Sequence, residues 1–173
     1  MTDVNSWFVA LLVGCALVAL LLLFQSQFIY FPLRYSTEKD WTADALSVLG
    51  HSLGGAVALQ FAARHSVRKI VLVSTFTTMG EMVRKQVGIT LGPLLRHRFD
   101  NLTSLATILS QNRVPEITIL HGQSDEIVPL RMGAALAQLD PSRIKFAAIP
   151  EADHNNIIQK AFPLILQTMG LQG

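Results

Sequence analysis

The sequence predicts an α/β protein that has a mostly parallel sheet of about four to five strands with flanking helices, preceded by one transmembrane helix. Three observations predict this fold class. Short apolar runs alternate with helix-like stretches, a glycine-rich turn joins the first run to the helix after it, and a long uncharged apolar stretch lies near the N-terminus. Together they indicate one globular domain behind a membrane segment.

Four apolar runs predict the strands, with cores at residues 45–49, 69–75, 116–120 and 143–149. Stretches long enough to form helices separate these runs, so consecutive strands are expected to be joined by crossovers and to run parallel. The carboxyl ends of parallel strands meet at one edge of a sheet. Polar residues that directly follow the runs are therefore expected to lie close together.

The chain has the sequence Gly-His-Ser-Leu-Gly-Gly at residues 50–55, between the first predicted strand and the helix-like residues 56–63. In this context Gly-x-Ser-x-Gly is typical of a nucleophile elbow, a strained strand-to-helix turn that exposes a serine hydroxyl. The flanking glycines are expected where side chains would collide with neighbouring backbone. Ser52 is therefore the candidate nucleophile, and the N–H of Leu53, at the helix start, is a candidate oxyanion donor.

Two later turns supply the other groups that a nucleophilic serine needs. Asp125 follows the third strand and His154 follows the fourth. A serine hydroxyl needs an imidazole to accept its proton, and the imidazole needs a carboxylate to fix its tautomer. The alternative is a turn serine, a turn aspartate and a surface histidine, which explains each segment singly. The order Ser, acid, His favours a Ser52-His154-Asp125 triad.

These segments carry a family resemblance. The motif at residues 50–55, His-Gly-Gln-Ser-Asp-Glu-Ile-Val-Pro at residues 121–129 and Ala-Asp-His at residues 152–154 resemble the α/β-hydrolase superfamily, over roughly residues 41–170. The apolar N-terminal stretch followed by Phe-Ile-Tyr-Phe-Pro at residues 28–32 is similar to a membrane-anchored subgroup of serine hydrolases.

The resemblance implies Ser52 as nucleophile, His154 as general base and then acid, Asp125 as the carboxylate that orients it, and the Leu53 amide as one oxyanion donor. It implies no metal and no organic cofactor.

The resemblance also implies that the front half of the fold is missing. The family fold has eight strands, and the match accounts for the last four. A second oxyanion donor normally comes from a loop that carries a His-Gly pair, and no such pair lies upstream of Ser52. The strand before Ser52 becomes a candidate edge strand. It is covered by residues 28–35, covered by a partner chain, or left uncovered. We therefore expect a shortened form of a longer hydrolase.

A membrane anchor is predicted at the N-terminus. Residues 7–24 are apolar, and no charged residue lies between Asp3 and Arg34. The apolar run is long enough for a helix that spans a bilayer. A cleaved signal peptide and a lipidated Cys15 are the alternatives, but no basic residue precedes the run and Cys15 lies in its middle. With Arg34 and Lys39 after the anchor, the positive-inside rule favours a cytoplasmic hydrolase domain.

The predicted division of the chain is an anchor at residues 1–27, a juxtamembrane junction at residues 28–40 and a truncated α/β-hydrolase domain at residues 41–173. Residues 78–112 lie where this fold often inserts a cap. They form either a short cap or flap with helical pieces broken at Gly92-Pro93, or ordinary helices that cover the core.

Composition excludes several classes of function. The formal net charge is +2 and the basic residues are scattered, so a nucleic-acid platform is not expected. One cysteine permits neither an intrachain disulfide nor a cysteine metal cluster, and the five histidines lack metal-ligand spacing. His51 and His121 are interpreted as structural.

Two functions remain. The first is a membrane-anchored serine hydrolase for an ester or thioester of a small-molecule or lipid-like substrate. The second is a noncatalytic interaction module or inactive shortened form that keeps the triad as inherited scaffold.

Overall fold

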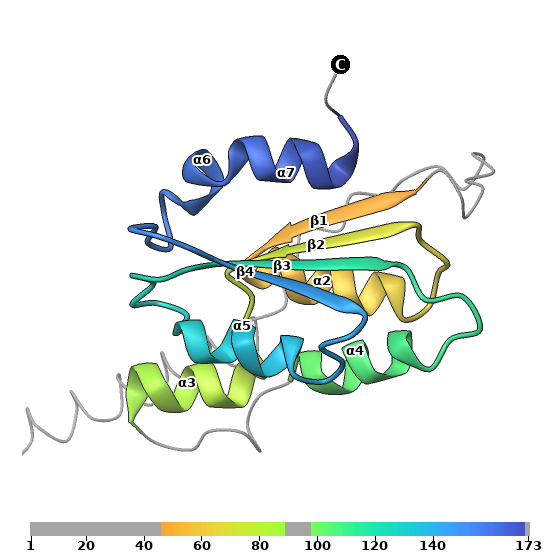
Figure 1. Cartoon of the computed structure of the whole chain (residues 1–173). Coiled ribbons are helices and arrows are strands. Elements are labelled where there is room, and N and C mark those ends of the chain that lie inside the picture. The colour runs from red at the N-terminus through yellow and green to blue at the C-terminus, as the bar shows by residue number, and fades with distance from the viewer. Residues whose placement is uncertain (1–45, 89–97, 172–173) are drawn as a thin grey trace, which may run out of the picture.

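Four short runs of aliphatic and β-branched residues form a parallel sheet in the computed structural model, which describes residues 46–88 and 98–171 (Figure 1). The strands lie in chain order across the sheet and every neighbouring pair is parallel. Their bounds are β1 Ser47–His51, β2 Lys69–Val73, β3 Glu116–Gly122 and β4 Ile144–Ile149. The four predicted strands and their parallel arrangement are confirmed.

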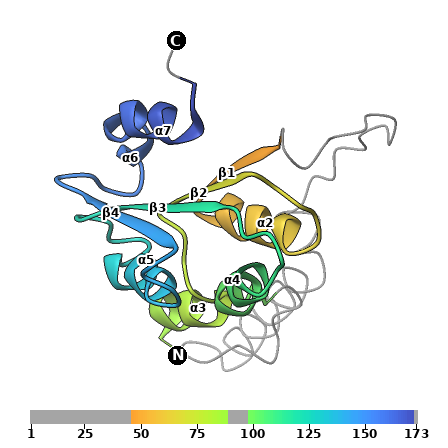
Figure 2. The ribbon, with the colours of Figure 1, turned by 45° about the vertical axis from the view of Figure 1, so that its right-hand side comes forward.

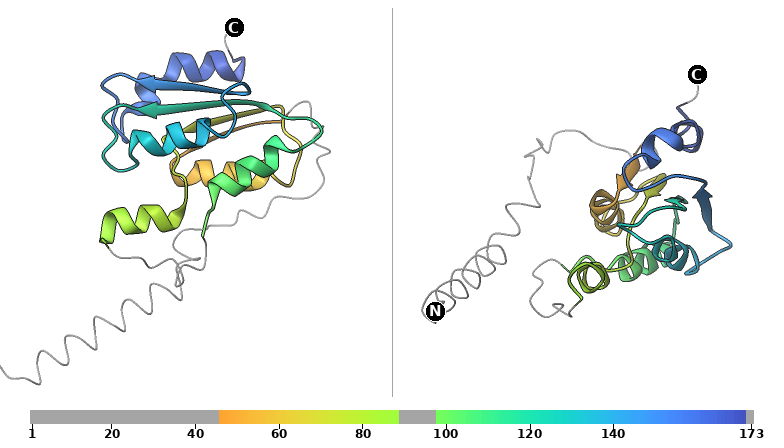
Figure 3. Two further views of the ribbon diagram at one scale, coloured as in Figure 1. Left: turned by 60° about the horizontal axis from the view of Figure 1, so that its bottom comes forward. Right: turned by 90° about the vertical axis from the view of Figure 1, so that its left-hand side faces the viewer.

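Helices cover both faces of this sheet. On one face α2 contacts β1 and β2, α4 packs on α2, and α5 packs on β3 and β4. On the other face α6 and α7 form the cover (Figure 1), and Figures 2 and 3 show the same division from other sides. The helices are α2 Leu53–Ala62, α3 Met79–Val87, α4 Asn101–Leu109, α5 Leu130–Ala137, α6 Ile157–Lys160 and α7 Phe162–Met169.

Because side chains alternate along each strand, the sheet has an apolar core on both faces. On the α2 side, Leu59, Leu105 and Leu136 from three different helices are fully buried against alternate residues of β2 and β3. On the α7 side, a smaller cluster packs beneath the last two helices. This second cluster consists of Val71, Val73, Leu120, Ala152, Ile157, Ala161 and Ile165.

Hydrogen bonds join the residues that precede α3 to those at the start of α4. Thr78 accepts a hydrogen bond from the N–H of Glu81 at the start of α3, and Asp100 accepts one from the N–H of Thr103 at the start of α4. Thr78 and Asp100 pair in an isolated antiparallel bridge. The Nδ2 of buried Asn101 donates to the carbonyl of Phe76 at 2.8 Å. Two interpretations of residues 78–112 were a cap and helices that cover the core. Helix α4 agrees with the second, because its Leu105 and Ile108 are buried in the core.

The first strand is shifted from its expected position. The sequence predicted a core at residues 45–49, whereas β1 is Ser47–His51, because the pairing with β2 continues to the residue before the elbow, where His51 lies opposite Val73. The predicted anchor at residues 1–27, the junction at residues 28–40 and the Gly92-Pro93 break lie outside the described residues. Within residues 46–88 and 98–171, no helix has the length and apolar character needed to cross a bilayer.

Within the described residues β1 forms one edge of the sheet, because it pairs with β2 alone. Leu49, in the middle of this strand, is 46% exposed, and Val57 and Phe61 on the adjoining α2 are also exposed. Charged residues and proline protect edge strands from pairing with other chains. The strand Ser-Val-Leu-Gly-His contains neither. The described part of the chain therefore presents an unprotected apolar edge beside the elbow.

Candidate active site

The turn between β1 and α2 holds Ser52 in a conformation that side chains rarely adopt. Its φ is 54° and its ψ is −119°, and its N–H donates to the carbonyl of Val73 at 2.9 Å. A non-glycine residue with positive φ at a strand-to-helix junction is the geometry expected of a nucleophile elbow. The turn leaves Ser52 only partly buried, with its hydroxyl directed to His154.

The glycines around Ser52 have different roles. A Cβ on Gly50 would lie 2.4 Å from the carbonyl oxygen of Gly54, and a Cβ on Gly55 would lie 1.9 Å from Oγ1 of Thr75. A Cβ on Gly54 would meet nothing within 4 Å. The expected backbone collision is therefore correct for Gly50 and wrong for Gly54. The second close approach is made by Gly55, against a side chain of the loop after β2.

The structure brings the three predicted residues together at the carboxyl ends of β1, β3 and β4. Nε2 of His154 lies 3.0 Å from Oγ of Ser52, and Nδ1 of His154 lies 2.9 Å from Oδ2 of Asp125. His154 and Asp125 are 8% and 6% exposed. Since a carboxylate accepts only, Nδ1 carries the proton, and Nε2 is left as the acceptor for the Ser52 hydroxyl.

The loop between β3 and α5, residues 123–129, is called the acid loop and holds the carboxylate of Asp125 as an anion. Its Oδ1 accepts hydrogen bonds from the N–H groups of Ile127 at 3.1 Å and Val128 at 2.8 Å. Burial raises the pKa of Asp125, but the hydrogen bond from His154, the nearby Ser74 side chain and the Val128 N–H lower it, and the net pKa lies below the ordinary value. Asp125 is therefore ionised at neutral pH and can stabilise an imidazolium.

Two histidines that the sequence interpretation left as structural contact the triad. Nε2 of His51 donates to the carbonyl of His154 at 3.1 Å, and the two rings lie 4.8 Å apart. His121 of β3 is fully buried. Its Nε2 donates to the carbonyl of Val128 at 2.8 Å and so ties the acid loop to the strand before it. Burial lowers the pKa of both His51 and His121, so both stay neutral at neutral pH.

Helix α3 also fixes the acid loop, which no feature of the sequence indicated. The ammonium of Lys85 donates to the carbonyls of Glu126 and Ile127, and Arg131 at the start of α5 pairs with Glu81 at 2.9 Å. The N–H of Ile127 in turn binds Asp125. These contacts join residues about forty to fifty positions apart, so spacing along the chain cannot reveal them.

One oxyanion donor is available in the described residues around Ser52. The N–H of Leu53 begins α2 and has no hydrogen-bond partner among residues 46–88 and 98–171. It is next to the nucleophile and at the positive end of the helix dipole. A donor from a loop upstream of the elbow would lie outside the described residues. No group of three or more potential metal ligands occurs in the described part of the chain.

Sequence comparison relates the chain to proteins without an assigned function. No family model matches the chain. Uncharacterized proteins of two Mycobacterium tuberculosis strains are 28% identical over 121 residues, which is 70% of this chain and 42% of each relative. The chain therefore spans less than half the length of these curated relatives.

Solved structures are similar in fold. An esterase domain from Rhodothermus marinus has a TM-score of 0.52 and 22% identity, and the match covers 72% of this chain and 58% of that one. The capsule O-acetyltransferase of Neisseria meningitidis serogroup A has a TM-score of 0.55 and 17% identity, with 78% and 58% covered. An esterase from Rhodococcus sp. has a TM-score of 0.50 and 16% identity, with 75% and 65% covered. The chain has part of the α/β-hydrolase fold, and at these identities the likeness shows the fold alone.

The glycine contacts make a prediction about stability. Gly50→Ala is expected to lower the free energy of unfolding by about 1–3 kcal/mol, because its Cβ collides with backbone that cannot move without distorting the elbow. Gly54→Ala is the matched control. It is expected to be neutral or stabilising by up to about 1 kcal/mol, since alanine favours helix and the space is open. Thermal unfolding of both variants measures this, and equal losses would contradict the account of the elbow.

Proposed function

We propose that this chain is a membrane-anchored serine hydrolase that cleaves an ester or thioester bond of a small-molecule or lipid-like substrate. The observation that carries the proposal is the continuous hydrogen-bonded series from Ser52 through His154 to Asp125, at 3.0 and 2.9 Å. The similarity in fold to proteins named as esterases supports it. An ionised, hydrogen-bonded carboxylate, a correctly oriented imidazole and a strained serine together have the geometry of an activated nucleophile.

The reaction follows from this arrangement. Ser52 Oγ attacks the carbonyl carbon while Nε2 of His154 accepts the hydroxyl proton, and Asp125 stabilises the imidazolium that forms. The N–H of Leu53 binds the oxyanion. As the tetrahedral intermediate collapses, His154 returns the proton to the leaving alcohol or thiol, and an acyl-enzyme remains on Ser52. Water, deprotonated by His154, then attacks the acyl carbon. As the Ser52 Oγ–acyl bond breaks, His154 returns this proton to Oγ, and a carboxylic acid is released.

The rate is expected to be limited by oxyanion stabilisation. Where a site lacks one of two oxyanion donors, turnover falls by about 100- to 1000-fold. If Leu53 supplies the only donor in this chain, Ser52 is readily acylated by reactive esters but turns over natural substrates slowly. A donor from residues 1–45 or from another polypeptide would remove this limit.

A noncatalytic interaction module is the second candidate function. Among residues 46–88 and 98–171, β1 is an edge strand, and Leu49, Val57 and Phe61 beside it are exposed. This favours the alternative, because an uncharged edge strand can pair with a strand of a partner chain. In this reading the triad is retained as scaffold. The two candidates differ in whether Ser52 reacts as a nucleophile.

Labelling with a fluorophosphonate separates the two functions. The full chain is expected to form a covalent adduct at Ser52, because only an activated serine attacks this phosphorus centre. Ser52→Ala is expected to abolish the adduct, and His154→Ala is expected to slow its formation by at least about a hundredfold. The measurement is the labelling rate by intact-protein mass spectrometry.

His65 and Ser66 provide matched controls, since they are the same residue types in the exposed turn after α2. Ala substitutions at these positions are expected to leave the labelling rate unchanged. Absence of labelling in a folded sample, or labelling that survives Ser52→Ala, would refute the hydrolase proposal and favour the interaction module.

The membrane anchor is a separate part of the proposal. It rests on the uncharged apolar residues 7–24, and the cytoplasmic side rests on Arg34 and Lys39 after them against Asp3 before them. A C-terminal fluorescent reporter that folds only in the cytoplasm is expected to be active and to sediment with membranes resistant to carbonate extraction. An active C-terminal alkaline phosphatase fusion would contradict the side, and release of the fusion by carbonate would contradict the anchor.

A further inference from the structure

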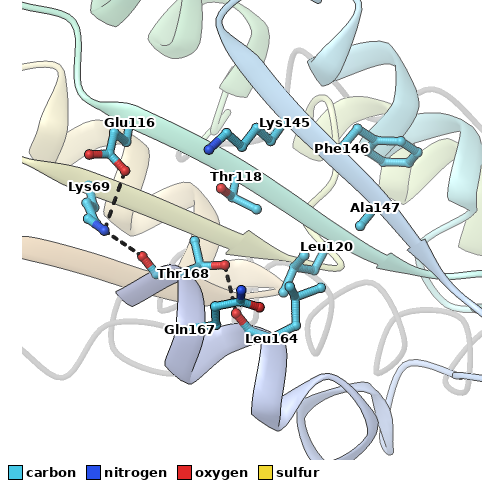
Figure 4. A pocket seen from close by; sticks show the side chains of 10 residues that line it. All are labelled: Lys69, Glu116, Thr118, Leu120, Lys145, Phe146, Ala147, Leu164, Gln167 and Thr168. Atoms are coloured by element: carbon cyan, nitrogen blue, oxygen red, sulfur yellow. Dashed lines mark hydrogen bonds and ion pairs between the residues drawn. The ribbon is translucent and has the colours of Figure 1, made fainter. Parts of the chain in front are cut away.

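A second candidate binding site lies beneath α7, on the face of the sheet opposite α2. It is a cavity of about 350 Å³ between α7 and strands β2, β3 and β4 (Figure 4). Ser52, Asp125 and His154 do not line it. Its volume is within the range of about 300–1,000 Å³ typical of small-molecule sites.

The strand register gives this cavity a polar end and an apolar end. Thr118 of β3 lies beside Lys145 of β4, and two residues further on Leu120 lies beside Ala147. Residues two apart on a strand share a face, so these four side chains are on the face that α7 covers. Leu164 of α7 closes the apolar end. The cavity therefore changes from polar to apolar along the strand direction.

One cation at the polar end is already neutralised. Nζ of Lys69 donates to the carbonyl of Thr168 at 2.9 Å and lies 3.4 Å from a carboxylate oxygen of Glu116 (Figure 4). Its side chain is only 16% exposed, which agrees with a structural role. Lys69 therefore ties α7 to β2 and leaves no positive charge for a ligand.

Two other polar groups of the cavity are unused. Thr118 is 7% exposed, and its hydroxyl has no hydrogen-bond partner among residues 46–88 and 98–171. The ammonium of neighbouring Lys145 likewise has neither an ion pair nor a hydrogen bond within those ranges. Both residues line the cavity and Lys145 is exposed, so the hydroxyl and the ammonium are accessible to a ligand that accepts hydrogen bonds.

We propose that this cavity binds a small aliphatic carboxylate. One carboxylate oxygen accepts from the Lys145 ammonium and from the Thr118 hydroxyl, and the aliphatic part packs on Leu120, Ala147 and Leu164. One unpaired ammonium matches the single negative charge of a carboxylate. The proposal is independent of the triad and does not rest on the proposed hydrolase activity.

Hexanoate is the probe, and hexylammonium is its control, since the two have the same alkyl chain and opposite charge. In the full chain, hexanoate is expected to shift the methyl NMR signals of Ala147 and Leu164 saturably, whereas hexylammonium leaves them unchanged. Lys145→Gln is expected to weaken hexanoate binding about tenfold, because it removes a charge-assisted hydrogen bond. Lys145→Arg is expected to retain binding.

Lys160→Gln is the matched control variant, because Lys160 is another exposed lysine, paired with Glu151 away from this cavity. It is expected to bind hexanoate as the unchanged chain does. The proposal is overturned if hexanoate leaves both methyl signals unchanged or shifts only those of Leu53 beside the triad. Equal responses to hexylammonium, or equal affinity in Lys145→Gln, also overturn it.

Discussion

The left-handed conformation of Ser52 is the constraint on which the rest of the site depends. With φ at 54°, the chain reverses between β1 and α2 within one residue, and this reversal is possible because Gly50 and Gly55 allow contacts that a Cβ would block. Backbone strain of this kind costs about 1–3 kcal/mol and persists only where surrounding structure holds it. Here the hydrogen bond from Ser52 N–H to Val73 and the burial of α2 against the sheet hold it.

The parallel sheet then determines what meets the serine. Because β1, β3 and β4 run in the same direction, the loops after them converge at one end of the sheet. His154 there contacts both Asp125, about 30 residues earlier in the chain, and Ser52, about 100 residues earlier. The acid loop is held on several sides, by its own N–H groups, by His121 from β3 and by Lys85 from α3. Both oxygens of Asp125 have partners, Oδ1 in the N–H groups of Ile127 and Val128 and Oδ2 in His154.

The sequence predicted the parallel sheet, the elbow and the three residues that meet, because each depends on local pattern and on the rule that parallel strands end together. It did not reveal the contact of His51 with His154 or the hydrogen bonds from Lys85 to the acid loop. These are long-range contacts between side chains and backbone, and no spacing along the chain encodes them. The sequence pattern assigned the second close contact to Gly54, whereas it lies at Gly55, because the Thr75 that excludes a side chain there comes from the loop after β2.

The central claim is that Asp125 orients His154 and thereby activates Ser52. The most direct test is the rate at which p-nitrophenyl acetate acylates Ser52 before steady state. The rate is compared between the unchanged chain, Asp125→Asn and the control Asp140→Asn, whose carboxylate pairs with Arg143 rather than with the triad. An amide at position 125 can donate to Nδ1 and reverse the tautomer, so acylation is expected to slow by about 10³- to 10⁴-fold in Asp125→Asn and to be unchanged in Asp140→Asn. Equal acylation rates in the two variants, with folding intact, would contradict the claim.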